Sequence, residues 1–146
     1  MKKLRDTIER FWFDPVTSKG FGLMRVLFGV ILFMAFLWQW NDVARYYSDI
    51  GMMPRSLMPD FLRHELRFSI LNYIGDPTAV FAIYLVLLTS LALVTLGIFT
   101  RPALILAMLL IFSFHERNPS LLAGGDTVMR HIAFFLVLAP SHRSFS

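Results

Sequence analysis

The stretch PTAVFAIYLVLLTSLALVTLG, residues 77–97, is almost continuously apolar and contains no charged side chain. Its length of about twenty residues is what a helix needs to cross roughly 30 Å of hydrocarbon. Asp76 and Pro77 are a typical helix start, a capping side chain followed by a proline at the first helical position. Gly97 is a typical helix end. We therefore predict a membrane-spanning helix over residues 77–97.

A second apolar run, FGLMRVLFGVILFMAFLWQW, occupies residues 21–40 and ends in two tryptophans that suit a membrane interface. Arg25 lies about one turn inside this run. The arginine either snorkels outward to the lipid headgroups, which is the interpretation that we favour, or turns inward to hold a polar group between helices. In both cases residues 21–40 are a second predicted span.

Two shorter apolar segments follow the quoted stretch. Residues 102–114 begin a third span, which reaches bilayer thickness only if the helix continues to about Arg117. The sequence GGD at residues 124–126 then breaks the chain and restarts it with Asp126 as helix cap, so that residues 127–140 form a short fourth helix. The predicted fold class is all-α, a polytopic integral membrane helical bundle of about four transmembrane helices.

The composition of the whole chain supports a membrane protein with one domain, residues 1–146. Hydrophobic residues make up 56% of the sequence and charged residues only 16%, whereas a soluble domain is usually about a quarter charged. The chain has no cysteine, which excludes disulfides and thiolate chemistry. The net charge of +4 comes from segments that flank the apolar runs, so we expect the lipid bilayer and not nucleic acid as a partner.

The N-terminal residues 1–20 are predicted to be an interfacial segment, in which residues 3–13 form an amphipathic helix on the membrane surface, with a solvated terminus as the alternative. Its dense basic residues favour the cytoplasmic side. Four spans then place both termini in the cytoplasm of a multi-pass protein of the cell (inner or plasma) membrane. Residues 41–77 form a long extracytoplasmic connector that caps the bundle, with short helices around residues 55–64 and 65–74.

This topology brings polar residues from three parts of the chain to one face. Most of them belong to the stretch SFHERNPSLLAGGDTVMRH, residues 113–131, in which Asp126 and Arg130 have ion-pair spacing on a helix. The cluster is either a set of helix caps and mutual ion pairs or a ligand pocket. A metal site is not expected, because no known ligand spacing is present and two arginines lie beside the acidic groups. The candidate ligand-binding residues are Arg117, Asn118, Asp126, Arg130, Glu116, Tyr47 and Asp49, and the candidate catalytic residues, for proton transfer, are His115 and His131.

Three stretches in combination, FGLMRVLFGVILF, RYYSDIGMMPRS and ERNPSLLAGGDTVMRHIAFFLVLAPSHRSFS, resemble the HTTM (horizontally transferred transmembrane domain) family. This family is the membrane module related to vitamin K-dependent γ-glutamyl carboxylase, and the resemblance covers nearly the whole chain. A weaker resemblance is to DoxX-like proteins, small four-span membrane proteins linked to quinone-dependent redox systems. Members of the HTTM family generally continue with further spans, so the chain is either a short member or the N-terminal half of a longer one.

The carboxylase resemblance implies proton abstraction by a base formed from vitamin K hydroquinone, with a lysine at the membrane boundary. The corresponding region here reads FHERNPS, residues 114–120, where Arg117 is the nearest cation. Arginine stays protonated in proteins and does not act readily as a base. We therefore do not expect carboxylase activity itself, and whether the chain is an enzyme stays open.

The expected function is that of an integral membrane module whose extracytoplasmic polar cavity binds a lipid- or quinone-like ligand. Such a module would be part of a membrane enzyme that modifies a secreted or membrane substrate. The alternative is a non-catalytic assembly or partner subunit, DoxX-like, whose charged cluster is structural and whose partner is a membrane protein or a second copy of the chain. A transporter is less well supported, because no broken helix is visible at mid-span.

Overall fold

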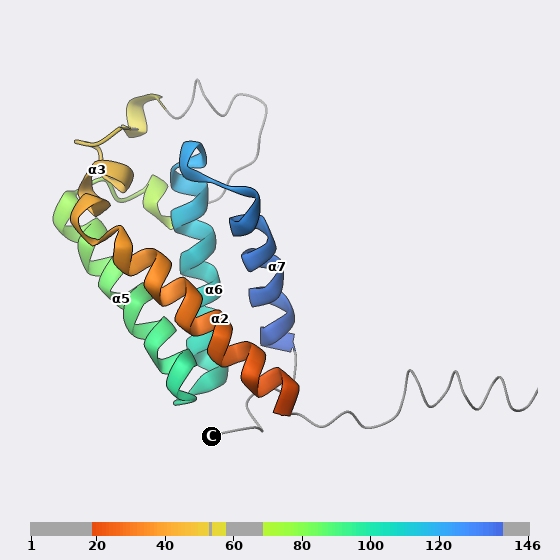
Figure 1. The fold of residues 1–146 in the computed structure, drawn as a ribbon. Helices are drawn as coiled ribbons and strands as arrows, with labels where there is room; N and C mark the ends of the chain where they lie inside the picture. The colour runs from red at the N-terminus through yellow and green to blue at the C-terminus, as the bar shows by residue number, and fades with distance from the viewer. Residues whose placement is uncertain (1–18, 53, 58–68, 139–146) are drawn as a thin grey trace, which may run out of the picture.

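The computed structural model describes residues 19–52, 54–57 and 69–138, and the regular structure in these ranges is helical throughout (Figure 1). This confirms the all-α class for the described part of the chain. Its long helices are α2 (Lys19–Trp38), α5 (Pro77–Leu96), α6 (Thr100–Arg117) and α7 (Gly124–Leu138). Short helices join them, namely η1 (Trp40–Asp42), α3 (Val43–Tyr47), η2 (Arg55–Leu57), η3 (Ile70–Asn72) and η4 (Pro119–Leu121).

Two of the described helices are long and apolar enough to cross a membrane by length and composition, Gly20–Trp38 and Pro77–Leu96. In the most apolar 18-residue stretch of each helix, only 33% and 39% of the residues are buried within the protein. The greater part of both helices is therefore not covered by the rest of the bundle. The helix α6 has 18 residues with charged groups at both ends, and α7 has 15 residues. Membrane crossing is therefore less directly indicated for these two helices.

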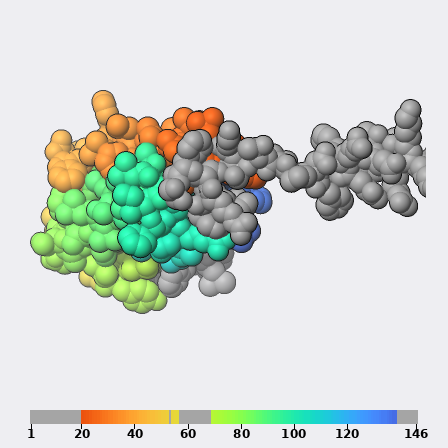
Figure 2. All heavy atoms as spheres, turned by 90° about the horizontal axis from the view of Figure 1, so that it is seen from below, coloured from red at the N-terminus to blue at the C-terminus, as the bar shows by residue number. Residues whose placement is uncertain are grey.

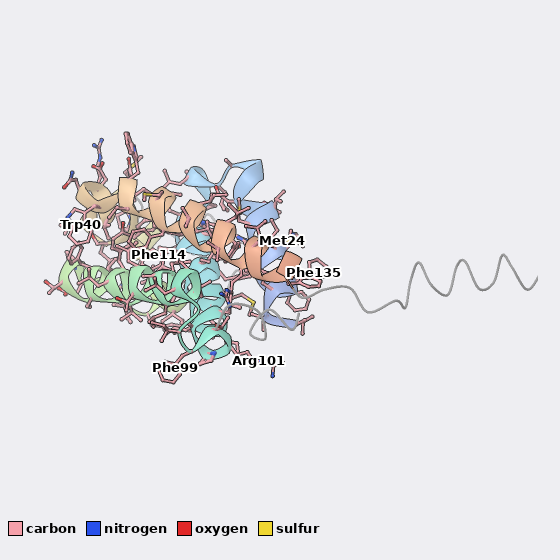
Figure 3. The ribbon with its side chains drawn as sticks, turned by 60° about the horizontal axis from the view of Figure 1, so that its bottom comes forward. Met24, Trp40, Phe99, Arg101, Phe114 and Phe135 are labelled. Carbon is pink, nitrogen blue, oxygen red and sulfur yellow. The ribbon has the colours of Figure 1, made fainter. Side chains whose placement is uncertain are left out.

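The long helices pack side by side, α2 against α5 and α7, and α6 against α5 and α7 (Figure 1). The buried residues of α5 recur every three or four positions, as expected for a helix with one face in a core. Aromatic rings fill the core near the charged end, where Phe114 contacts Phe36, Tyr47 and Tyr84 edge-on. Figure 3 labels Phe114 among the side chains of the bundle. Viewed from below, part of the α5 and α6 surface is exposed on the outside of the molecule (Figure 2).

The close packing of α2 on α5 depends on a glycine. A Cβ atom added at Gly29 would lie 3.2 Å from the backbone nitrogen and 3.3 Å from the Cα of Thr95, and closer still to the Thr95 hydroxyl. Small residues at such crossings let two helix backbones approach closely, an arrangement common between membrane helices. Gly29 therefore sets the distance between α2 and α5.

The helix ends agree with the sequence-based prediction for α5 and differ for α7. The Asp76 carboxylate accepts a hydrogen bond from the backbone N–H of Ala79 at 2.9 Å, and Gly97 ends α5 with a φ of 78°. The predicted cap of α7 is wrong, because the helix begins at Gly124 and Asp126 lies in its first turn. Asp126 instead accepts a hydrogen bond from the backbone N–H of Ala123 at 2.8 Å, which is the reverse arm of a capping box.

Arg25 turns inward, so the favoured snorkelling interpretation is wrong. Its side chain is 1% exposed, and Nη1 donates to the Thr100 hydroxyl at 3.3 Å. That hydroxyl in turn donates to the Gly97 carbonyl at 2.9 Å. The turn between α5 and α6 thus supplies a hydrogen-bond acceptor to the Arg25 guanidinium inside the bundle. This acceptor offsets part of the cost of holding the charged side chain away from the membrane interface.

Some predictions lie outside the described residues. The interfacial helix predicted over residues 3–13 falls in the undescribed segment 1–18, and the end of the predicted fourth helix falls in residues 139–146. In the connector, the described parts of the predicted short helices are the single turns η2 and η3. Ser69, which caps η3, donates to the Ser113 carbonyl at 2.6 Å and so fixes the end of the connector on α6.

Candidate functional site

The connector is held to the end of α6 by a charged group that we call the Asp49 network, formed by Asp49, Arg55 and Arg117. Arg117 Nη2 lies 3.0 Å from Asp49 Oδ1, and Arg55 Nε lies 2.6 Å from Asp49 Oδ2. The backbone N–H of Arg55 also donates to Asp49 Oδ1 at 3.0 Å. One carboxylate therefore joins a fully buried arginine to an exposed one.

The last turn of α6 also binds the end of α3 through its backbone. Arg117 is 0% exposed, and its Nε donates to the Tyr47 carbonyl at 3.1 Å. The neighbouring Asn118 donates from Nδ2 to the Tyr46 carbonyl at 2.9 Å. These carbonyls belong to the C-terminal turn of α3, where helix carbonyls lack partners within the helix and favour cationic donors.

The Asp49 network changes the acidity of its carboxylate. Partial burial acts to raise the pKa of Asp49, but the hydrogen bonds from Arg55 and the positive charges of Arg55 and Arg117 outweigh it, so that the pKa lies below the ordinary aspartate value. Beside it, burial raises the pKa of Tyr47, helped by the nearby Tyr84 and Asp126. The Tyr47 hydroxyl is thus a stable donor, and it donates to Gln39 Oε1 at 2.7 Å.

A second group of charges, which we call the Glu116 network, joins α6 to α7. Arg130 forms an ion pair with Glu116, and its Nε donates to His115 Nδ1 at 3.2 Å. The guanidinium also lies 5.3 Å from the centre of the Phe112 ring. Arg130 therefore pairs across the helix interface and not with Asp126 on its own helix, although their spacing predicted that pair.

A small polar cavity lies beside the Glu116 network. His115 stacks on the Phe36 ring with centroids 5.9 Å apart and planes at 15°, and its Nε2 lies 3.9 Å from Asp126 Oδ1. The cavity volume is about 30 Å³, which is about the space of one water molecule. Its lining residues are Gln39, Tyr47, Phe114, His115, Asn118, Leu121, Leu122 and Asp126.

Most of the predicted site residues meet in these two networks and the cavity between them. The residues that meet at the Asp49 network are Tyr47, Asp49, Arg117 and Asn118. Those that meet at the Glu116 network are Glu116, Arg130, His115 and Asp126. His131 does not join either one, since it is exposed and its Nδ1 donates to the Thr127 carbonyl at 2.7 Å.

Sequence reasoning missed Arg55 and Gln39 as members of this site. Arg55 follows a proline in the connector, and only its pairing with Asp49 reveals a role. Gln39 is the single amide between two tryptophans at the end of the first apolar run, which is a signal that could have found it. Among the described residues, no group of three or more His, Asp or Glu side chains is placed to hold a metal ion.

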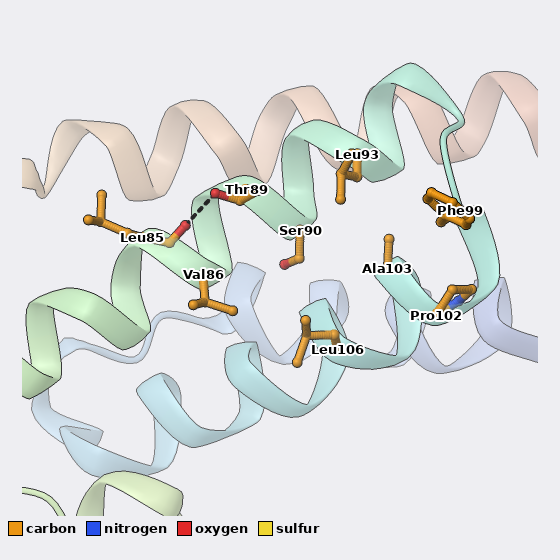
Figure 4. Close-up of a pocket in the computed structure, with 9 residues that line it drawn as sticks. All are labelled: Leu85, Val86, Thr89, Ser90, Leu93, Phe99, Pro102, Ala103 and Leu106. Carbon is orange, nitrogen blue, oxygen red and sulfur yellow. Dashed lines mark hydrogen bonds between the residues drawn. The ribbon is translucent and has the colours of Figure 1, made fainter.

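An apolar groove of about 460 Å³ runs between α5 and α6, away from the charged end (Figure 4). Its hydroxyl groups are bonded within their own helix, Thr89 to the Leu85 carbonyl at 2.8 Å and Ser90 to the Leu87 carbonyl at 2.7 Å. Arg101 is exposed next to the groove residue Pro102, at the same end of the bundle as Phe99 (Figure 3). The lining residues are Leu85, Val86, Thr89, Ser90, Leu93, Phe99, Pro102, Ala103 and Leu106.

In the described part of the chain, fold and site together define a helical bundle with two helices long and apolar enough to cross a membrane and a network of paired charges at one end. No protein-family model matches the chain, and no match was found among curated proteins or solved structures. The residues themselves therefore carry the functional argument.

Proposed function

We propose that the chain is an HTTM-type integral membrane module of four spans that binds a membrane lipid along α5 and α6. At 1.5 Å per residue, the 18 residues of α6 extend for about 27 Å, close to the thickness of the hydrocarbon core. The shorter α7 would cross with its charged first turn at the boundary. In this arrangement both termini are cytoplasmic, and the Asp49 and Glu116 networks lie at the extracytoplasmic end.

The groove between α5 and α6 is the observation that carries this proposal. Its volume of about 460 Å³ falls within the range of about 300–1,000 Å³ typical of ligand pockets. The hydroxyl hydrogens of Thr89 and Ser90 are already donated to backbone carbonyls. These two groups therefore offer no free donor to a polar ligand, which favours a hydrocarbon chain as the occupant.

The chemistry at the mouth of the groove favours a lipid with an anionic headgroup. Arg101 adjoins Pro102 where α5 and α6 join, which is the cytoplasmic end in the proposed orientation. Basic side chains at that surface attract anionic lipids of the cytoplasmic leaflet. A quinone-like molecule also has an apolar chain but lacks the negative headgroup that would pair with Arg101.

The charged networks support a structural role for the opposite end of the molecule. Arg117 occupies the region where the carboxylase resemblance would place a lysine, and it is engaged with Asp49 and the Tyr47 carbonyl. The cavity next to the networks admits about one water molecule and is too small for the chain of a lipid. We therefore place the apolar body of the ligand in the groove between α5 and α6.

Native mass spectrometry of the full chain, extracted from its membrane in lipid nanodiscs, tests the proposal. Val86→Phe narrows the groove at a residue whose side chain is 47% exposed, and Leu109→Phe is the matched control on α6 outside the groove. We expect anionic lipid to remain bound to the wild type and the control and to fall several-fold in Val86→Phe. Equal binding in all three proteins, or a bound quinone, would overturn the lipid assignment.

The second candidate is a non-catalytic partner subunit, which the mutual pairing of the charges favours. Four of the charged groups form two ion pairs between different elements, Asp49 with Arg117 and Glu116 with Arg130. The same mass measurement distinguishes this candidate, because a partner subunit would appear as a second protein, or a second copy of the chain, in fixed stoichiometry.

A further inference from the structure

The hydrogen bond between Arg130 and His115 fixes the direction in which the histidine donates. An arginine guanidinium has only donors, so His115 Nδ1 must accept the bond from Arg130 Nε. In the neutral ring the proton therefore resides on Nε2. The stack on Phe36 holds the ring plane, so this N–H stays directed at the Asp126 side of the cavity.

Acceptor atoms of three side chains also line the cavity. Asp126 Oδ1 lies 3.9 Å from His115 Nε2, which is too long for a direct hydrogen bond. Asn118 is 2% exposed and uses its Nδ2 to bind the Tyr46 carbonyl, while its buried Oδ1 has no partner among the described residues. Gln39 Oε1, which accepts from Tyr47, retains a second lone pair.

The N–H of His115 facing the carboxylate of Asp126 across this gap selects the ligand by its chemistry. A cation cannot accept the N–H of His115, and an anion is repelled by the Asp126 carboxylate and cannot donate to it. A hydroxyl group does both, because it has one or two hydrogens to donate and lone pairs that accept. The cavity of about 30 Å³ has room for one such group.

We propose that the cavity between His115 and Asp126 is a binding site for a single hydroxyl group, occupied by a water molecule. The water accepts from His115 Nε2–H and donates to Asp126 Oδ1, with the buried Oδ1 of Asn118 as a further acceptor within the lining. This site is independent of the lipid groove, since it lies at the other end of α6. In this site His115 donates a hydrogen bond to the bound hydroxyl, and Asp126 accepts a hydrogen bond from it.

Nuclear magnetic resonance of the full chain in nanodiscs, with 15N-labelled histidine, tests this site. His115 is assigned by the loss of its signals in His115→Gln. We expect the Nε2-protonated tautomer, and transfer of magnetisation from the Nε2 proton to a bound water. A ring protonated at Nδ1, or an Nε2 proton without contact to any hydroxyl, would overturn the proposal.

Two variants show where the signal originates. Leu122→Phe fills the cavity and should abolish the transfer to water, whereas Leu109→Phe, on an exposed position of α6 outside the cavity, should retain it. Transfer that persists unchanged in a folded Leu122→Phe protein would contradict the site. Transfer to the hydroxyl of a bound organic molecule, identified by mass spectrometry of the same sample, would support the hydroxyl site and assign its occupant to that molecule.

Discussion

Asp49 Oδ1 and Arg117 Nη2 lie 3.0 Å apart although 68 residues separate them in the sequence. The contact joins the connector after α3 to the last turn of α6, and Arg117 is fully buried there. A buried guanidinium is costly without a partner, so the connector and the end of α6 stabilise each other. The Asp49 carboxylate is therefore the charged group that balances Arg117 at this end of the bundle.

Replacing that carboxylate should destabilise the protein. Asp49→Asn removes the charge that compensates Arg117, and we expect a loss of about 2–4 kcal/mol, in the range measured for buried pairs that lose one partner. Thermal unfolding in nanodiscs measures it. The matched control is Asp42→Asn, whose exposed pair with Arg45 is 4.0 Å long and should contribute less than about 1 kcal/mol. Equal losses in the two variants would contradict the central role of Asp49.

The same carboxylate should make stability depend on acid. Because the pKa of Asp49 is lower in the folded protein than in the unfolded chain, its contribution is fully present above the ordinary aspartate pKa of about 3.9 and is lost as the pH falls through the lower folded value. The melting temperature of the wild type should therefore fall more steeply below about pH 4 than that of Asp49→Asn. Parallel pH profiles for the two proteins would show that Asp49 does not contribute.

Gly29 should tolerate no side chain. A Cβ at this position meets the Thr95 backbone at 3.2 Å, so Gly29→Val should push α2 from α5 and cost about 1–3 kcal/mol, as overpacking does. Gly20 provides the control, since a Cβ there meets nothing within 4 Å. Gly20→Ala should leave the melting temperature unchanged or raise it slightly, because alanine favours a helix. A stable Gly29→Val protein would mean that α2 and α5 do not pack as described.

His131 should be dispensable, in contrast to its sequence-based assignment as a proton-transfer residue. It is exposed on α7 and bonded only locally, to the Thr127 carbonyl, among the described contacts. His131→Ala should change the free energy of unfolding by no more than about 0.5 kcal/mol, as is usual at the surface. It should also leave the nuclear magnetic resonance signals of His115 in place, and a shift in the His115 tautomer would contradict this placement.

The sequence predicted what depends on neighbouring residues. The cap at Asp76 and the stop at Gly97 are local signals, and the structure confirms both ends of α5. Residues 102–114 were expected to reach bilayer thickness only if their helix continued to about Arg117, and α6 ends at that residue. The interactions that decide the two ends of α5 lie within that helix and its caps.

The errors in the prediction come from contacts between distant parts of the chain. Arg25 turned inward because Thr100, 75 residues away, offers it a hydroxyl. The spacing of Asp126 and Arg130 along α7 predicted that these two residues pair. Arg130 pairs instead with Glu116, which the packing of α7 against α6 brings to it. The groove was not predicted at all, since its lining is shared between α5 and α6 and depends on how the two helices pack, with small residues such as Ser90 and Ala103 in its wall.

The central claim, that α6 crosses a membrane and carries the charged networks to its outer side, can be tested by labelling single cysteines. The chain contains no native cysteine, so each introduced thiol gives an unambiguous signal. Ser120 and Ile98 are exposed beyond opposite ends of α6 and are suitable positions. In intact cells, a membrane-impermeant maleimide should label Ser120→Cys directly and Ile98→Cys only after permeabilisation. Labelling of both positions from the same side would contradict the account.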